Sequence, residues 1–362
     1  MTTPLARRLA EEIAASGPMP VARYMALCLG DPEHGYYTTR VPFGRDGDFV
    51  TAPEVSQLFG ELVGAWLLTV WEQLGSPDPV RLVELGPGRG TLMADILRVA
   101  RLRPAFLEAV SVDLVETSPR LRALQKETLR ACPVPVAWRN AIDEVPPGPL
   151  LVVANEFFDA LPIRQFVRTG DRWQERVVGL DAAGGLGFGL APYAQDAAIP
   201  PGLDAQDGAV VEWCPAADAI MAAVSERIVA EGGAALAIDY GYQGPAFGDT
   251  LQAVRDHAYT GLLEAPGESD LTAHVDFATL ARSARTAGAA IHGPLTQGEF
   301  LVALGLVDRA QRLAAGTDET GFREIEAAVR RLADVTEMGE LFKVLAVTSP
   351  GVAPPAFPAR PR

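Results

Sequence analysis

The sequence has few cysteines and few histidines, and each shortage excludes a class of site. Its three cysteines, Cys28, Cys132 and Cys214, are far apart and odd in number, which excludes a disulfide framework and a cysteine-based zinc site. The four histidines never form a pair at metal-ligand spacing, so no metal is expected. These features fit a protein of a reducing compartment.

Positive charge and long apolar runs are also scarce. The chain has 31 Lys and Arg against 46 Asp and Glu, a formal net charge of -15, which argues against a general nucleic-acid or anionic-membrane binder. The most membrane-like run, residues 62–71, lies between two glutamates and is far shorter than the about 20 residues of a bilayer span. The N-terminus has no apolar signal core, and Glu11 and Glu12 are unlike a transit peptide. We therefore expect a cytosolic protein without membrane insertion.

One stretch combines a strand, a glycine turn and a helix. Residues 81–85 are mostly apolar, Gly86, Gly88 and Gly90 follow at alternate positions, and a helix with one apolar face is predicted from Thr91. Glycine has no Cβ, so the backbone can approach a ligand closely, and the helix N-terminus offers free N–H groups. Counted from Gly86, Thr91 occupies the position of the last glycine in the G-x-G-x-x-G motif of dinucleotide sites, so the spacing here differs from that motif. A tight turn without a ligand is the alternative.

Two acids end neighbouring predicted strands. Glu84 precedes the glycine turn, and Glu116 ends the next strand, where doubly wound nucleotide folds place the carboxylate that binds ribose hydroxyls. An acid at position 84 suits a ligand with a cation or hydroxyls better than it suits a pyrophosphate. With Gly86, Pro87, Gly88 and Gly90, these acids are typical of S-adenosylmethionine (SAM) methyltransferases.

Strands and helices alternate along the chain, which predicts an α/β fold with a mostly parallel, Rossmann-like sheet. Further strands are predicted at residues 134–138, 150–154 and 234–239, and a β-hairpin at 165–178, whereas residues 242–273 show no regular pattern. We expect five parts: an N-terminal helical and lid segment at 1–75, the first part of the SAM-binding core at 76–162, a β-rich insertion at 163–215, the rest of the core with a helical insertion at 216–350, and a disordered tail at 351–362.

A long loop rich in glycine and proline precedes a helix predicted over residues 54–74. In this loop Gly47, Asp48, Phe49 and Thr51 are expected to form a lid over the cofactor. The alternative is that Thr51 simply caps the helix, with an acid three residues later.

Polar residues also follow the third and fourth predicted strands. Asn140 and Ala141 come where the adenine is commonly bound, with an irregular loop as the alternative. Asn155, Glu156 and Asp159 follow the fourth strand, on the side of the sheet that faces the methyl group and the acceptor. The two acids are three residues apart, so both can point into one cleft, where carboxylates can bind a guanidinium group. Alternatively, they cap a helix.

Motifs distributed over nearly the whole chain resemble the MidA-type SAM-dependent methyltransferases. They lie at residues 47–56, 82–92, 154–162, 238–241, 270–277, 296–301 and 338–342. The mitochondrial members often carry histidine at the position of Asn155. The resemblance implies a seven-stranded SAM-binding sheet with a substrate-facing insertion. It also implies a protein-arginine methyltransferase that acts on a subunit of respiratory complex I (NADH dehydrogenase), with a homodimer as one possible assembly.

Two other functions are compatible with such a sheet. An NAD(P)-dependent oxidoreductase is disfavoured by Thr91 in the fingerprint. A non-catalytic assembly chaperone is disfavoured by Glu84, Glu116 and Glu156, because a pure scaffold has no use for costly polar groups in a cleft.

Overall fold

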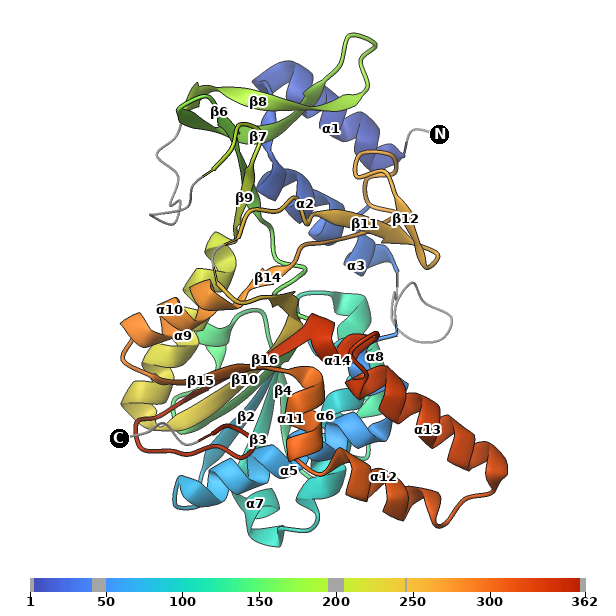
Figure 1. The fold of residues 1–362 in the computed structure, drawn as a ribbon, viewed down its shortest axis with the longest axis vertical. Helices are drawn as coiled ribbons and strands as arrows, with labels where there is room; N and C mark the ends of the chain where they lie inside the picture. The colour runs from blue at the N-terminus through green and yellow to red at the C-terminus, as the bar shows by residue number, and fades with distance from the viewer. Residues whose placement is uncertain (1–2, 41–49, 195–204, 245, 359–362) are drawn as a thin grey trace.

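The computed structural model describes residues 3–40, 50–194, 205–244 and 246–358, and a mixed, mostly parallel sheet lies at its centre (Figure 1). The strands follow the order β15-β16-β10-β5-β2-β3-β4, and the short β14 pairs with β10. Neighbours from β10 to β4 are parallel, whereas β16 is antiparallel to β10 and β15. The bounds are β2 (Val80–Leu85), β3 (Val110–Val115), β4 (Val136–Arg139), β5 (Leu150–Asn155), β10 (Gly233–Tyr242), β14 (Val275–Asp276), β15 (Ala290–Thr296) and β16 (Phe342–Thr348). The expected α/β class is confirmed, with eight strands in this sheet among the described residues instead of seven.

Helices cover both faces of the sheet because its central strands are apolar on both sides. Successive side chains alternate, so Leu82 packs with one hydrophobic layer and Val83 with the other. The first layer contains α5 (Gln57–Gln73), α6 (Thr91–Ala100) and α7 (Pro104–Ala109), and the second contains α9 (Pro215–Glu231) and α10 (Phe277–Thr286). The helix α8 (Pro119–Thr128) follows β3. Among the described residues, no helix is both long and apolar enough to cross a bilayer.

The helix expected over residues 54–74 is broken at Ser56. This residue has an extended backbone with φ -164°, and its hydroxyl accepts a hydrogen bond from the amide of Leu58, which makes it the N-cap of α5. The preceding turn is a separate short helix, α4 (Ala52–Val55). The cap therefore fixes where the segment before α5 turns toward the sheet.

A second sheet lies above the central one (Figure 1) and is antiparallel. It contains β1 (Met19–Pro20), β6 (Arg164–Thr169), β7 (Arg172–Leu180), β8 (Leu186–Ala194) and β9 (Val210–Trp213), and the expected hairpin at 165–178 is β6–β7. The helices α1 (Pro4–Ser16) and α2 (Val21–Gly30) share a hydrophobic core with this sheet, and α3 (Tyr36–Thr39) follows them. The N-terminal helices thus pack on strands far along the chain.

Residues 242–273, for which no regular structure was expected, contain a third sheet. Its strands are β11 (Gln252–Arg255), β12 (Ala258–Thr260) and β13 (Asp270–Thr272), in the order β12-β11-β13. Pairing between β11 and β13 joins residues about 20 positions apart, such as Gln252 and Thr272. Such pairing leaves no local pattern in the sequence.

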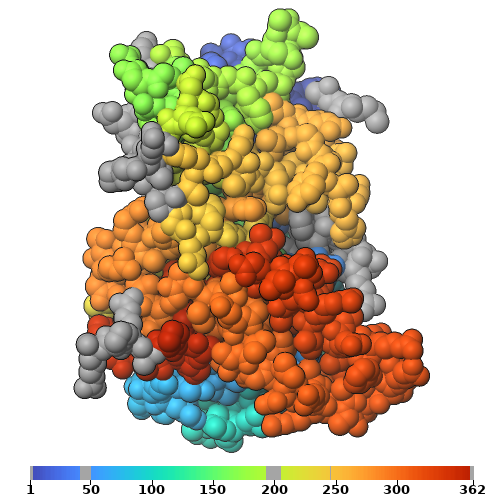
Figure 2. All heavy atoms as spheres, in the orientation of Figure 1, coloured from blue at the N-terminus to red at the C-terminus, as the bar shows by residue number. Residues whose placement is uncertain are grey.

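The C-terminal part adds α11 (Gln297–Ala303), α12 (Leu306–Ala314), α13 (Glu319–Ala333) and α14 (Met338–Leu341), and α12 and α13 project at the lower right (Figures 1 and 2). The expectation of a disordered tail is wrong for residues 351–358. Phe357 is buried against Phe300, with ring centroids 5.8 Å apart, and the Trp66 indole donates to the carbonyl of Pro355 at 3.2 Å. These two contacts hold the segment against the core, although it is rich in proline.

Candidate active site

The glycine turn after β2 adopts a backbone that other residues rarely adopt. The φ angles of Gly86, Gly88 and Gly90 are 64°, 52° and 83°, all in the left-handed region. Gly90 is the N-cap of α6. A Cβ atom built on Gly86 would lie 2.8 Å from Cδ2 of Phe157, so this position also lacks space for a side chain.

This turn forms one wall of a pocket of about 390 Å³ at the carboxyl ends of β2 and β5. The segment before α5 and the start of the loop after β5 form the other walls. The lining residues are Thr51, Pro53, Glu54, Glu84, Gly86, Pro87, Gly88, Arg89, Thr91, Leu92, Asn155 and Glu156. The structure therefore brings together seven of the residues expected at the site: Thr51, Glu84, Gly86, Pro87, Gly88, Asn155 and Glu156.

Two buried polar atoms in this pocket have no hydrogen-bond partner among the described residues, Oε2 of Glu84 and Oδ1 of Asn155. Glu84 is 3% exposed, and burial raises the pKa of its carboxyl to about 8. Buried polar atoms in native proteins are normally paired. An unpaired carboxylate and amide oxygen are therefore suited to a ligand that carries ammonium or hydroxyl donors.

Glu156 lies in the left-handed region, with φ 49°, directly after β5. Its Oε1 accepts hydrogen bonds from the backbone amide of Ala52 at 3.0 Å and from Nδ2 of Asn155 at 3.2 Å. Burial raises the pKa of this carboxyl, and the two hydrogen-bond donors lower it. The effect of burial is larger, so the pKa is about 7. Glu156 is thus a half-buried acid whose pKa of about 7 is close to neutral pH.

Asp239, in β10 beside the end of β5, holds the loop that presents Glu156. Its Oδ2 accepts hydrogen bonds from three consecutive backbone amides, those of residues 157, 158 and 159, at 2.9 to 3.2 Å. The side chain is fully buried, and burial raises its pKa well above the usual range. Asp239 belongs to the motif at residues 238–241, but the motif does not indicate this anchoring contact.

Asp159 does not point into the same pocket as Glu156, contrary to the expectation. It is 6% exposed and lines no part of that pocket, it lies close enough to the Tyr240 hydroxyl to interact with it electrostatically, and its Oδ1 has no hydrogen-bond partner among the described residues. Burial raises the pKa of Asp159 to about 6. Asp159 lies close enough to Glu156 to raise the pKa of that carboxyl, although it does not share the lining of this pocket.

Four expected cofactor residues, Gly90, Glu116, Asn140 and Ala141, lie outside the lining of this pocket. The carboxylate of Glu116 accepts from the amide of Ser118 at 2.7 Å and from Nε2 of Gln125 at 3.2 Å, so part of its capacity is used within the protein. Asn140 is exposed, and its Nδ2 donates to the Glu144 carboxylate at 2.9 Å. Gly47, Asp48 and Phe49, expected in the lid, lie outside the described residues.

The N-terminal region reaches the end of β3 through two hydrogen bonds. The hydroxyl of Ser118 donates to the carbonyl of Tyr37 at 2.7 Å, and the guanidinium of Arg120 donates to the carbonyl of Thr39 at 2.8 Å. The segment α3 therefore lies next to the strand end that carries Glu116.

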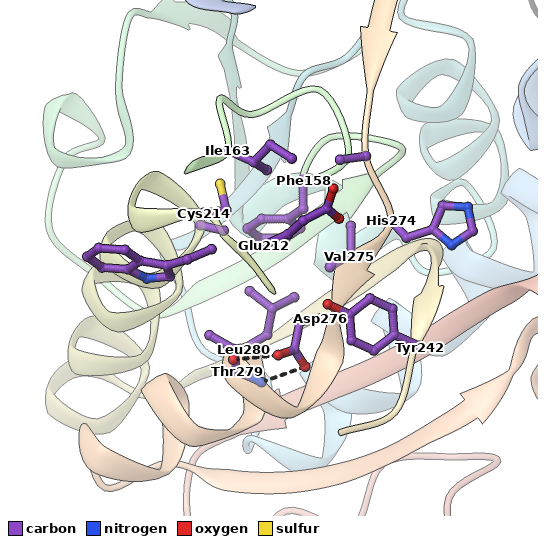
Figure 3. Close-up of a pocket in the computed structure, with 13 residues that line it drawn as sticks. Phe158, Ile163, Glu212, Cys214, Tyr242, His274, Val275, Asp276, Thr279 and Leu280 are labelled. Carbon is purple, nitrogen blue, oxygen red and sulfur yellow. Dashed lines mark hydrogen bonds between the residues drawn. The ribbon is translucent and has the colours of Figure 1, made fainter. Parts of the chain in front are cut away.

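A second pocket, of about 450 Å³, lies between the β9–α9 region and β14–α10 (Figure 3). It contains two acids, Glu212 and Asp276. Glu212 accepts from the amide of Thr250 at 3.0 Å and from Nε2 of Gln165 at 2.7 Å, and Asp276 caps α10 through Thr279. Both acids have structural partners and no glycine turn borders them, so the pocket beside Glu84 is the better candidate for the active site.

Comparison with known proteins assigns the family. Residues 62–295 match a family model described as a putative S-adenosyl-L-methionine-dependent methyltransferase. The chain belongs to this family.

Relatives cover almost the full length. The human protein named protein arginine methyltransferase NDUFAF7, mitochondrial, is 38% identical over 95% of this chain and 83% of its own length. The Drosophila melanogaster homolog is 36% identical over 96% of this chain and 85% of its own length. A solved structure from Burkholderia thailandensis bound to S-adenosyl-homocysteine is 33% identical, with a TM-score of 0.83 over 96% of this chain and 92% of the other.

The protein is therefore a SAM-dependent methyltransferase with SAM as its cofactor. The oxidoreductase and chaperone alternatives are not favoured. The expectation of a cytosolic location is contradicted, because the relatives from zebrafish, human and mouse are all named as mitochondrial.

The pocket beside Glu84 fits SAM. Its left-handed glycine turn leaves the backbone exposed to a ligand, and its unpaired acceptors on Glu84 and Asn155 match the ammonium and hydroxyl groups of the cofactor. Three lining residues were not expected at the site: Arg89, Thr91 and Leu92. Arg89 lies within the glycine turn and the other two begin α6 directly after it, whereas Pro53 and Glu54 belong to the expected lid segment after Thr51.

Proposed function

We propose that this methyltransferase transfers the methyl group of SAM to a nitrogen of an arginine side chain in a protein, and that a subunit of respiratory complex I is the first acceptor to test. The observation that carries the proposal is the half-buried carboxylate of Glu156 at the edge of the SAM pocket, with its raised pKa. The names of the relatives, which are protein arginine methyltransferases, support the same chemistry.

A guanidinium group is planar and permanently charged, so a carboxylate can bind it through two parallel hydrogen bonds. Glu156 has a pKa of about 7 in the unliganded protein because it is buried. A guanidinium beside it favours the charged carboxylate and lowers that pKa. Glu156 would therefore orient the acceptor nitrogen and compensate its charge in a site that excludes water.

Asn155 and Asp159 complete the proposed acceptor side of the site. Asn155 donates to Glu156 at 3.2 Å and would fix the direction of the carboxylate. Asp159 interacts electrostatically with the Tyr240 hydroxyl and would act through it as a positioning residue. When nitrogen forms its bond to carbon, one N–H proton must leave, and a carboxylate that titrates near neutrality is a suitable acceptor for it.

The residues proposed to bind the cofactor lie mostly at the carboxyl ends of the strands. SAM supplies an activated methyl group on a sulfonium centre. Glu84, Gly86, Pro87, Gly88 and Gly90 would hold it at the turn, and Glu116 would accept from the ribose hydroxyls, because each carboxylate oxygen has two acceptor positions. Asn140 and Ala141 would border the adenine. Thr51, which lines the pocket, would contribute to the lid.

The test is methylation of purified complex I subunits by the full chain with isotope-labelled SAM, followed by mass spectrometry of the labelled peptides. We expect label on arginine nitrogen, and no label with Glu156→Gln. Label on another residue type, or no protein labelling while S-adenosylhomocysteine (SAH) binds, contradicts the proposal.

A further inference from the structure

Glu156 lines two hollows, because it also borders a wide groove of about 1490 Å³ that opens on the other side of its loop. No other residue is common to the linings of these two hollows in the described part of the chain. The groove is lined by Val50, Glu156, Tyr240, Gln252, Val254, His257, Tyr259, His274, Arg331, Met338, Leu341 and Phe342. The groove is much larger than the SAM pocket and meets it at the proposed acceptor carboxylate.

One wall of the groove is the β11–β12 hairpin. Val254 and Tyr259 are paired across the hairpin, so their side chains lie on the same face, together with that of Gln252. Asp256 and His257 form the turn, with φ angles of 52° and 61°. Tyr259 is 78% exposed and thus offers an aromatic ring to the groove.

The opposite wall belongs to the C-terminal helices. It is formed by α14, the start of β16 and the end of α13, which lie below the hairpin (Figures 1 and 2). Leu341 on this wall is 46% exposed. The rings of Tyr240 and His274 meet edge to face, 5.3 Å apart, and complete the lining next to Glu156. Apolar groups thus face each other across a groove with a carboxylate between them.

The hairpin also presents an open strand edge. In the described part of the chain β12 is the outer strand of its sheet, so one side of its backbone has no strand partner. Such edges can add an extended peptide through main-chain hydrogen bonds, while pockets beside them select side chains. An exposed tyrosine and leucine on facing walls are suitable anchors for a peptide.

We propose that this groove binds an extended polypeptide segment of the acceptor protein and directs one of its side chains to Glu156. The identity of that side chain as arginine rests on the proposed function, whereas the groove as a peptide site does not. Arg331 adds positive charge to the same lining and lies close enough to Glu156 to lower its pKa. A segment with a neutral or acidic residue beside its arginine therefore fits better than a polybasic one.

The test measures binding of short fluorescent peptides that are tiled across the complex I subunits and contain one arginine each, by polarisation with SAH present. The variants are Tyr259→Ser and Leu341→Ser. The matched control is Phe322→Ser, which removes another exposed apolar side chain, 53% exposed on α13, outside the groove. Melting temperature and SAH affinity are measured on every variant.

If the groove binds peptide, each groove variant weakens the best peptide by about tenfold, as for an interface anchor, and the control leaves it unchanged. Equal binding by wild type and groove variants overturns the proposal, and so does failure of every peptide to bind. A peptide that binds equally well with citrulline in place of arginine supports the groove but contradicts arginine as the acceptor. Methylation of free arginine without any peptide binding overturns the groove as a polypeptide site.

Discussion

The backbone amide of Ala52 donates a hydrogen bond of 3.0 Å to the Glu156 carboxylate, although the two residues are far apart in the chain. This contact joins the segment before α5 to the end of β5. The same segment lines the SAM pocket through Thr51, Pro53 and Glu54. A charged carboxylate is a stronger hydrogen-bond acceptor than a protonated carboxyl. Ionisation of Glu156 therefore stabilises the observed position of this segment, and that position in turn favours ionisation.

Replacing Glu156 by glutamine removes the charge but keeps an oxygen that can accept from Ala52. We expect methyl transfer to fall a few-hundred-fold or more, because an unpaired partner of a buried ion pair costs about 3–5 kcal/mol. SAH affinity should change little. Calorimetry and initial rates on the same preparation measure both quantities, and normal turnover would rule out Glu156 as the acceptor clamp.

Asp159→Asn should act through Tyr240, because Asp159 is buried outside the pocket lining and interacts electrostatically with that hydroxyl. We expect a smaller loss of turnover than for Glu156→Gln, and a similar loss for Tyr240→Phe. The double variant should lose little more than either single one, because both changes break one interaction. Additive losses in kcat would show that Asp159 has a role independent of Tyr240.

SAH affinity should depend on pH through Glu84. Burial raises the pKa of this carboxyl to about 8, so at neutral pH most unliganded molecules carry it protonated. The ammonium group of the ligand favours the ionised form, so binding releases a proton and the affinity rises from about pH 6 to about pH 8. Calorimetry in buffers of different ionisation enthalpy detects that proton. The Glu84→Gln variant should bind more weakly and lose the pH dependence, and a persistent dependence would place the titrating group elsewhere.

The unliganded protein should lose stability as the pH rises from about 4.5 to about 8. Glu84 and Glu156 have pKa values of about 8 and about 7, raised from 4.5 by burial, so the folded state binds their protons more tightly than the unfolded state. Their stabilising contribution is complete below the unfolded pKa and is lost as the pH passes through the folded values. Melting temperatures of wild type and the Glu84→Gln/Glu156→Gln double variant test this. The variant should show a shallower decline, and parallel declines would contradict the assignment.

Gly86→Val should abolish SAM binding in a folded protein. The position has φ 64°, and a Cβ there meets the Phe157 ring at 2.8 Å, so the turn and the loop after β5 must both shift. The matched control is Gly184→Val, since Gly184 has φ 82° but nothing within 4 Å of its Cβ position. Both variants carry backbone strain, and only the first should lose the ligand. Unchanged SAH affinity in folded Gly86→Val would show that the cofactor site does not lie at this turn.

Glu116→Ala should reduce SAM affinity and stability together. A hydrogen bond to a charged acceptor contributes about 1.5–3 kcal/mol, and this carboxylate also accepts from the amide of Ser118. Ser118→Ala serves as the comparison, because it removes the hydroxyl that caps α8 and donates to Tyr37 but leaves the carboxylate in place. Affinity within a factor of two of the parent for Glu116→Ala would contradict the ribose assignment.

Local chemistry made much of this fold predictable. The glycine turn follows from Gly86, Gly88 and Gly90, since other residues rarely adopt their φ values, and the β6–β7 hairpin follows from a short turn between alternating strands. Contacts between residues far apart in the chain could not be predicted from local sequence patterns. The strand β15 was not expected because Gly293 and Pro294 interrupt it, where its register against β16 shifts.

For the site, the sequence identified the strand ends but not the direction of each side chain. Asn155 and Glu156 line the pocket as expected, because a side chain at the carboxyl end of a parallel strand faces the ligand side. The direction of Asp159 depends on the φ of 49° at Glu156 and on the amides that Asp239 holds. Both depend on β10, a strand about 80 residues further along the chain, so spacing within the 155–159 motif could not predict them.

The hairpin that borders the groove has consequences for how this enzyme family diversifies. Its two strands pair within a sheet of their own and contribute no strand to the central sheet. Substitutions at exposed positions such as Tyr259 therefore leave the glycine turn and the strand ends untouched. With the proposed groove, acceptor preference would change with these exposed residues, whereas the glycine turn and the buried Glu84 at the cofactor pocket would stay the same. Related enzymes with the same cofactor turn would then differ in protein target through single surface substitutions.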